Sequence, residues 1–122
     1  MKSKKSLLIV EDDPMNLWIY GIILNKQYDV KLCKSGDEFI NELREKTYDL
    51  FLIDLGLGHG KNGIELIKEL RAWDKYKKKP IIVLTAFTNK KDEIIAKLAG
   101  ATVFLRKPIK KENLLSVFKN FD

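Results

Sequence analysis

The sequence has a single cysteine, Cys33, and a single histidine, His59. One cysteine cannot form a disulfide within the chain. One cysteine and one histidine also cannot supply the set of ligands that a structural zinc ion requires. Because proteins of oxidising compartments commonly rely on disulfides, we expect a reduced, cytoplasmic protein.

Long apolar runs are also missing. The longest, residues 17–24, includes Gly21 and has eight residues, whereas a membrane-spanning helix needs about 18 or more. The basic start of the chain leads into an apolar run that is too short for a secretory signal. We therefore expect neither a membrane span nor a signal peptide.

Charge of one sign does not dominate the sequence. The net charge is +6, from 23 basic and 17 acidic residues. A positive balance suits nucleic-acid binding, but the basic residues are spread along the chain. Their one cluster, Lys75 with residues 77–79, precedes Pro80 and a strand-like run, as a solvated loop does. Nucleic-acid binding is therefore not the function that the sequence favours.

The size and composition are those of one globular domain. The chain has 122 residues, of which 45% are hydrophobic, and we expect a single domain over residues 1–122. Five short runs have the composition of strands: 7–10, 28–32, 50–53, 81–84 and 101–105. Three of them are continuously apolar, as strands buried on both faces are. The run 28–32 alternates and predicts an edge strand.

Helical patterns lie between these runs. Pro14 suits the first position of a helix, Ser35 with Glu38 predicts a capping box, and Gly100 suits a helix end. The expected helices follow Pro14 and Ser35 and cover residues 63–73, 90–98 (capped by Thr88 or Asn89) and 110–120. Strand and helix thus alternate five times. This order predicts an α/β fold with a doubly wound, open, five-stranded parallel sheet.

In such a sheet, ligands bind at the carboxyl ends of the strands. The residues with chemical potential at these ends are Glu11, Asp12 and Asp13 after the first strand, Asp54 after the third, Thr85 after the fourth and Lys107 after the fifth. Individually, several have another explanation, since Asp13 before Pro14 is a good helix N-cap. Asp54 is harder to explain in this way, because it directly follows a buried apolar run.

Together these residues suit phosphoryl transfer to a carboxylate. Converging aspartates supply hard oxygen ligands for Mg²⁺ and leave the site open. Asp54 can then attack a phosphorus atom and become an aspartyl phosphate. Because both reactants are anionic, the metal and Lys107 would offset their repulsion, while Thr85 would donate a hydrogen bond to a phosphoryl oxygen.

The same residues resemble the motifs of the CheY-like receiver domains of two-component response regulators, and the resemblance covers essentially the whole chain. The matching residues are Asp12-Asp13, Asp54, Thr85-Ala86 and Lys107-Pro108, with Phe104 at the family's aromatic switch position. The resemblance implies a flavodoxin-like (βα)5 sheet of order 2-1-3-4-5. It further implies that Asp54 is the phosphoacceptor and that Mg²⁺ is held by Asp12, Asp13, Asp54 and the backbone carbonyl of Gly56.

Partners and output also follow from the resemblance. The implied phosphate donor is a phosphohistidine on a histidine kinase or a histidine phosphotransfer protein. The domain would promote its own phosphorylation and dephosphorylation without being a turnover enzyme. Phosphorylation is expected to draw Thr85 toward the phosphoryl group and to make room for Phe104. The affected surface would be residues 89–98, the last strand and the last helix, which would contact an effector that the sequence does not name.

Two departures from the family pattern fall in the loop after Asp54. Gly58 stands where the family commonly has proline, and Gly63 comes nine positions after Asp54 instead of eight. The rate of phosphorylation or the lifetime of the phosphate is therefore open, although the acceptor is not. We interpret His59 in this loop as a solvated residue and not as a relay base.

Two other functions remain as alternatives. A receiver-like interaction module that works without phosphate is compatible with the loop departures, but Thr85, Lys107 and the acidic residues weigh against it. A nucleotide- or flavin-binding enzyme on the same fold would need a glycine-rich phosphate loop after the first strand. Residues 11–14 at that place are acidic instead.

The first helix is apolar almost all round, which is more than one buried face requires. Trp18 and Ile22 therefore either form an exposed docking patch or are covered by neighbouring helices. In the receiver family this helix commonly meets the phosphohistidine-bearing partner.

Overall fold

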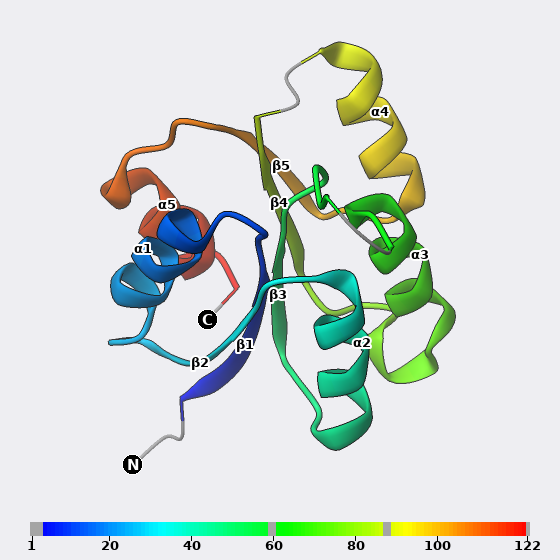
Figure 1. Cartoon of the computed structure of the whole chain (residues 1–122), viewed down its shortest axis with the longest axis horizontal. Helices are drawn as coiled ribbons and strands as arrows, with labels where there is room; N and C mark the ends of the chain where they lie inside the picture. Colours follow the sequence, from blue (N-terminus) through cyan, green and yellow to red (C-terminus); the bar gives the residue numbers. More distant parts are fainter. Residues whose placement is uncertain (1–3, 59–60, 87–88, 122) are drawn as a thin grey trace.

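Strands and helices alternate along the chain in the computed structural model, which describes residues 4–58, 61–86 and 89–121 (Figure 1). The strands are β1 (Lys5–Val10), β2 (Tyr28–Cys33), β3 (Leu50–Ile53), β4 (Ile81–Thr85) and β5 (Val103–Arg106). The helices are α1 (Pro14–Leu24), α2 (Gly36–Glu45), α3 (Gly63–Ala72), α4 (Lys90–Ala99) and α5 (Lys111–Lys119), with a short 3₁₀ helix, η1 (Asp74–Tyr76), after α3. No helix among the described residues is long and apolar enough to cross a bilayer.

The sheet is parallel, with the strand order β2-β1-β3-β4-β5. The predicted doubly wound fold and its strand order are therefore confirmed. Val10 at the end of β1 pairs with Ile53 at the end of β3, so the chain leaves both strands at the same level. Among the described strands, β2 pairs with β1 alone, which confirms the predicted edge strand.

The helices cover both faces of the sheet. Helices α1 and α5 lie on one face, and α2, α3 and α4 lie on the other (Figure 1). Successive residues of β1 point to opposite faces, so that Leu8 belongs to the core under α2 and α3 and Leu7 to the core under α1 and α5. Both are fully buried, which explains why the run 7–10 is apolar at every position.

Short side chains begin the helices largely as the sequence predicts. The Ser35 hydroxyl accepts the Glu38 N–H at 3.2 Å and caps α2. The predicted capping box is only half formed, because the Glu38 carboxylate accepts the N–H of Lys34 instead of that of Ser35. Asn89 caps α4, whereas Thr88, the other candidate, lies outside the described residues.

One helix ends as the sequence predicts, and another ends earlier. Gly100 ends α4 with a φ of 126°, the left-handed backbone that the sequence predicts there. The helix predicted over residues 63–73 ends at Ala72, and η1 follows it. The ring of Tyr76 in η1 is buried against Phe51, with 5.2 Å between ring centroids. That contact joins distant parts of the chain, so local patterns could not predict it.

Candidate functional site

Two carboxylates are buried side by side where β1 and β3 end. The backbone N–H of Asp54 donates to the carbonyl of Val10 at 3.2 Å, so the pairing of β1 with β3 continues to this residue. The N–H of Glu11 donates to the carbonyl of Cys33 in β2 at 3.1 Å. Glu11 is 1% exposed and Asp54 is 7% exposed. The main chain therefore fixes both residues at the carboxyl edge of the sheet.

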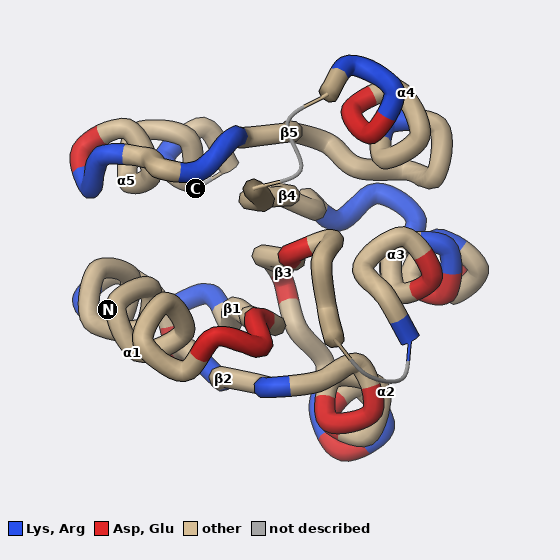
Figure 2. Tube along the Cα trace, turned by 45° about the horizontal axis from the view of Figure 1, so that its top comes forward, with Lys and Arg blue, Asp and Glu red and all other residues tan. Residues whose placement is uncertain are grey.

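Lys107 connects the two carboxylates. Its ammonium lies 2.9 Å from Asp54 Oδ2 and 2.5 Å from Glu11 Oε1. The residue directly follows β5, and its backbone N–H donates to the carbonyl of Thr85 at the end of β4. The ends of four strands thus meet around one residue. Figure 2 shows the acidic segment after β1 facing the carboxyl end of β3.

Backbone amides after β3 orient two of the carboxylates. The N–H of Gly56 donates to Asp54 Oδ1 at 3.0 Å, and the N–H of Gly58 donates to Asp12 Oδ2 at 3.0 Å. Asp54 therefore accepts one hydrogen bond on each oxygen, from Gly56 and from Lys107. The loop that follows Asp54 also holds Asp12 in place.

The carboxylate oxygens of Glu11, Asp12 and Asp54 lie within 4.8 Å of one another. Asp12 is exposed while the other two are buried, so the cluster is open on one side. Three carboxylate oxygen donors with an open side fit a hard divalent cation that retains several waters, as Mg²⁺ does. Ligation by the Gly56 carbonyl stays a prediction.

Asp13 does not belong to this cluster, which corrects the predicted acidic pair. Its Oδ1 accepts the N–H of Met15 at 3.0 Å and caps α1, the alternative explanation that its place before Pro14 suggested. The acidic pair after β1 that joins Asp54 is therefore Glu11 and Asp12. One signal could have indicated this shift, since Glu11 directly follows a buried apolar run, as Asp54 does.

The two predicted switch residues lie on neighbouring strands. Thr85 ends β4 and is fully buried. Phe104 in β5 is 9% exposed and packs in the core under α2, α3 and α4. A buried ring agrees with both interpretations of Phe104, as switch or as core aromatic, so the switching role stays a prediction.

The loop between Asp54 and α3 is packed closely at its far end. A Cβ at Gly63 would lie 2.4 Å from the carbonyl oxygen of Asp54, closer than nonbonded atoms approach. Glycine is thus required there, although it comes one position later than the family pattern places it. His59, interpreted as a solvated loop residue, lies outside the described residues.

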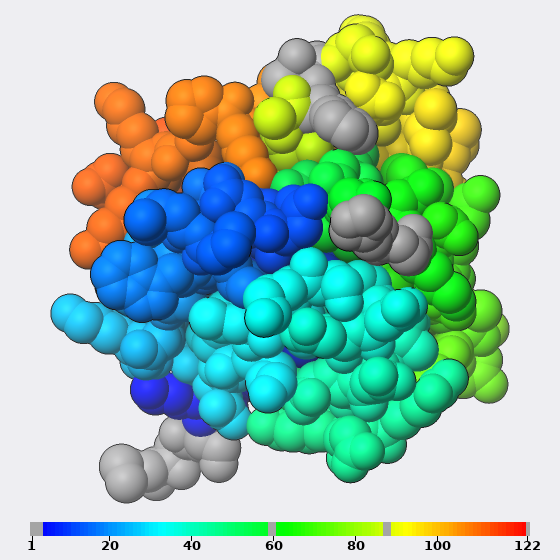
Figure 3. Space-filling view, in the orientation of Figure 1, coloured from blue at the N-terminus to red at the C-terminus, as the bar shows by residue number. Residues whose placement is uncertain are grey.

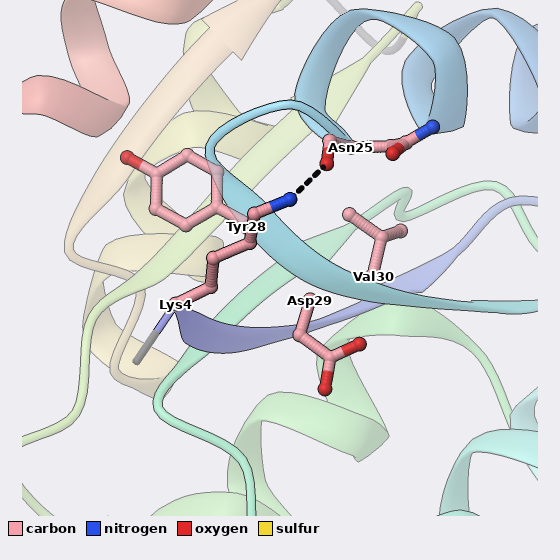
Figure 4. A pocket seen from close by; sticks show the side chains of 5 residues that line it. All are labelled: Lys4, Asn25, Tyr28, Asp29 and Val30. Atoms are coloured by element: carbon pink, nitrogen blue, oxygen red, sulfur yellow. Dashed lines mark hydrogen bonds between the residues drawn. The ribbon is translucent and has the colours of Figure 1, made fainter. Parts of the chain in front are cut away.

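Hollows also lie elsewhere on the surface of the described residues. One, of about 470 Å³, is lined by Lys4, Asn25, Tyr28, Asp29 and Val30. The Lys4 side chain extends across it to the carbonyl of Asn25 (Figure 4). This hollow is at the amino end of β2, the opposite end of the sheet from Asp54. Another, of about 250 Å³, lies between α1 and β2.

Comparison with known proteins agrees with this geometry. A family model described as the response regulator receiver domain matches residues 7–119. The chain is 30% identical over 118 residues to the polar-differentiation response regulator DivK of Brucella anthropi, covering 96% of this chain and 95% of that protein. It is 33% identical over 113 residues to the regulatory protein VanRB of Enterococcus faecalis, covering 93% of this chain but 50% of that protein.

A solved structure completes the comparison. The receiver domain of a sensor histidine kinase from Pseudomonas aeruginosa, with a magnesium ion in its active site cleft, superposes with a TM-score of 0.87 at 28% identity, covering 98% of each chain. The chain belongs to the response regulator receiver family. The acidic cluster of this receiver domain lies at the carboxyl edge of its sheet.

Burial and pairing shift the acid–base behaviour of the receiver site. Burial raises the pKa of Glu11 to about 7, although the hydrogen bond from Lys107 opposes the shift. Burial would also raise the pKa of Asp54, but the Gly56 amide and Lys107 outweigh it and lower that pKa. The two carboxylates in turn raise the pKa of Lys107 despite its burial. Asp54 is therefore an anion at neutral pH and Lys107 a cation.

The stability of the metal-free receiver domain should fall as pH rises through the range in which Glu11 titrates. The folded protein holds the Glu11 proton up to about pH 7, whereas the ordinary value is 4.5. The folded state therefore binds more protons in this window, and stability decreases across it by ~3 kcal/mol at most. The pKa of Asp54 is shifted to below this window and that of Lys107 to above it, so neither residue titrates within it.

Urea unfolding in EDTA at about pH 5 and about pH 8 measures this effect. Glu11→Gln should flatten the difference, because other titrating groups are common to both proteins. An equal pH dependence in the parent and in Glu11→Gln would contradict the assignment.

The corrected acidic pair predicts which aspartate supports metal binding. Asp12→Asn should weaken Mg²⁺ binding by about tenfold or more, because a charged oxygen ligand is lost. Asp13→Asn is the matched control, since asparagine is as good an N-cap as aspartate. Calorimetric titration with Mg²⁺ measures both. A loss in Asp13→Asn as large as that in Asp12→Asn would restore the pair expected from sequence.

Proposed function

We propose that this receiver domain accepts a phosphoryl group on Asp54 from a phosphohistidine donor, in a reaction that depends on Mg²⁺. One observation carries the proposal. An ionised carboxylate, Asp54, lies 2.9 Å from a permanent cation, Lys107, beside a cluster of carboxylates that fits a divalent ion. The donor would be a histidine kinase or a histidine phosphotransfer protein.

Asp54 is suited to be the nucleophile. Its lowered pKa keeps it anionic at neutral pH. Attack by a carboxylate oxygen on the phosphorus forms a phosphorus–oxygen bond while the phosphorus–nitrogen bond to the donor imidazole breaks. The main-chain bonds that hold Asp54 at the edge of the sheet fix the direction of attack, which is the chief requirement of phosphoryl transfer.

Charge neutralisation is the second requirement. Lys107 offers an ammonium beside the position that the phosphoryl oxygens would take, and Thr85 offers a hydroxyl from the neighbouring strand end. Glu11, Asp12 and Asp54 would hold Mg²⁺. When bound there, the ion supplies the positive charge that lets an anionic donor approach three carboxylates.

The donor would dock on α1, next to the acidic cluster. Leu17, Tyr20 and Leu24 face the core, while Met15, Trp18, Ile19 and Ile22 remain on the surface. Trp18 is 60% exposed and Ile22 is 51% exposed, so neighbouring helices do not cover these two residues. Figure 3 shows α1, in blue, at the surface above α2, in cyan. The hollow between α1 and β2 extends this apolar patch.

The proposed result of phosphorylation is a change in a surface of the domain and not the release of a product. The proposed output surface comprises α4, β5 and α5, reached through Thr85 and Phe104. The domain would thus act as a switch for an effector protein and would not turn over substrates in the ordinary sense. Its phosphorylation and dephosphorylation would use the same residues.

Replacement of the acceptor tests the proposal directly. With acetyl phosphate and Mg²⁺, the parent should gain the mass of one phosphoryl group and Asp54→Asn should not, because an amide does not attack phosphorus. Asp49→Asn is the control, since Asp49 precedes the same strand at its opposite end. Intact-protein mass spectrometry measures the product. A parent that gains no mass would favour the alternative, an interaction module that works without phosphate.

A charge on the α1 patch should separate docking from chemistry. Trp18→Glu should slow transfer from the cognate phosphohistidine protein by about tenfold or more, because an exposed aromatic anchor becomes a charge. Labelling by acetyl phosphate should stay unchanged. Leu98→Glu, at a residue that is 83% exposed on α4, is the matched control. Unchanged transfer to Trp18→Glu in a panel of donors would remove α1 from the docking surface.

A further inference from the structure

Phe104 has a charged neighbour on its own strand. Alternate residues of a strand share a face, so Arg106 projects from β5 on the same side as Phe104. The guanidinium carbon of Arg106 lies 5.6 Å from the centroid of the Phe104 ring. A planar cation over an aromatic face at this distance is an attractive contact. Arg106 therefore covers the ring at the end nearer the carboxyl edge.

Glu93 in α4 holds this cation in place. Arg106 Nη2 donates to Glu93 Oε1 at 2.8 Å, and the Glu93 side chain is 27% exposed. Lys97, one turn further along α4, lies 3.7 Å from the other carboxylate oxygen. The chain of contacts runs from Phe104 in the core through Arg106 to Glu93. It joins β5 to α4 within the proposed output surface.

The same strand end touches the phosphorylation site. Arg106 pairs in register with Thr85, and the next residue, Lys107, contacts Asp54. A shift of Thr85 or Lys107 would therefore change the backbone from which Arg106 projects. The position of the cation over the ring depends on that backbone.

We propose that the Arg106–Glu93 ion pair is a latch that holds Phe104 in its buried position and so favours the conformation to which phosphorylation shifts the domain. This inference rests on the proposed function, in which Thr85 moves toward the phosphoryl group and makes room for a buried Phe104. Arg106 and Glu93 are positioning residues, since they act through Phe104. By linkage, a contact that stabilises the phosphoryl-binding conformation raises the affinity for a phosphoryl group or its analogue.

Glu93→Gln tests the latch through the sign of its effect. Beryllofluoride with Mg²⁺ serves as the phosphoryl analogue on Asp54, and calorimetry measures its affinity. Removing a negative charge near the site would by simple Coulomb attraction tighten binding of an anion. The latch predicts the opposite, a weakening of about two- to fivefold, because the buried position of Phe104 loses its support.

A second readout follows the ring itself. In the Glu93→Gln protein without ligand, Phe104 should become more accessible to a soluble paramagnetic agent in NMR spectra, with its signals assigned through Phe104→Leu. Arg106→Lys should give an intermediate affinity, because it keeps the ion pair but loses the planar group over the ring. A role in stability alone would not move the Phe104 signals of the folded protein.

Two controls remove other ion pairs. Lys97→Met deletes the second partner of Glu93 and should leave the affinity for beryllofluoride within the error of the parent value. Asp29→Asn breaks the surface pair with Lys46, whose exposure equals that of Arg106, at the far edge of the sheet. It should also have no effect.

The outcomes separate this inference from the proposed function. If the parent binds beryllofluoride and Glu93→Gln binds it equally or more tightly, with Phe104 unchanged, the latch is wrong and the proposed function stands. If the parent does not bind beryllofluoride with Mg²⁺, the proposed function is wrong and the latch falls with it. Weaker binding by Glu93→Gln together with a more accessible Phe104 supports the latch.

Discussion

The shared contact of Lys107 with two buried carboxylates governs the carboxyl edge of the sheet. Burial opposes charge on Glu11 and Asp54, and two adjacent anions also repel each other. A single ammonium between them, with the Gly56 amide, outweighs these effects at Asp54, which stays ionised, but not at Glu11, where burial raises the pKa to about 7. Because Lys107 also bonds to Thr85 through its backbone, the same residue ties β5 to the end of β4.

This arrangement explains how a local reaction can reach a distant surface. A phosphoryl group on Asp54 would add negative charge where Lys107 and Thr85 already lie. Those residues terminate the two strands that border α4. Arg106, immediately before Lys107, carries the contact onward to Glu93, while Phe104 lies beneath it in the core. The ends of these strands would therefore connect the proposed reaction to the helix that would meet an effector.

Much of the site could be predicted because strand ends are visible in the sequence. Asp54 and Lys107 follow apolar or strand-like runs, and parallel strands bring such ends together. The acidic pair was shifted by one residue, since Glu11, Asp12 and Asp13 are alike in type and only the end of β1 decides which side chain turns inward. The cap on Met15 and the amide of Gly58 then assign Asp13 to α1 and Asp12 to the cluster.

Residue order alone was enough for the alternation of strands and helices, because burial on one or both faces leaves a periodic apolar pattern. It was also enough to single out Asp54, since a carboxylate after a buried strand needs an opposite charge nearby. Three features depended on the folded chain: the place of Glu11 in the cluster, the exposure of Trp18, and the contact of Arg106 with Glu93. Each of these features depends on whether elements that are distant in sequence come into contact. Local sequence patterns do not predict such contacts.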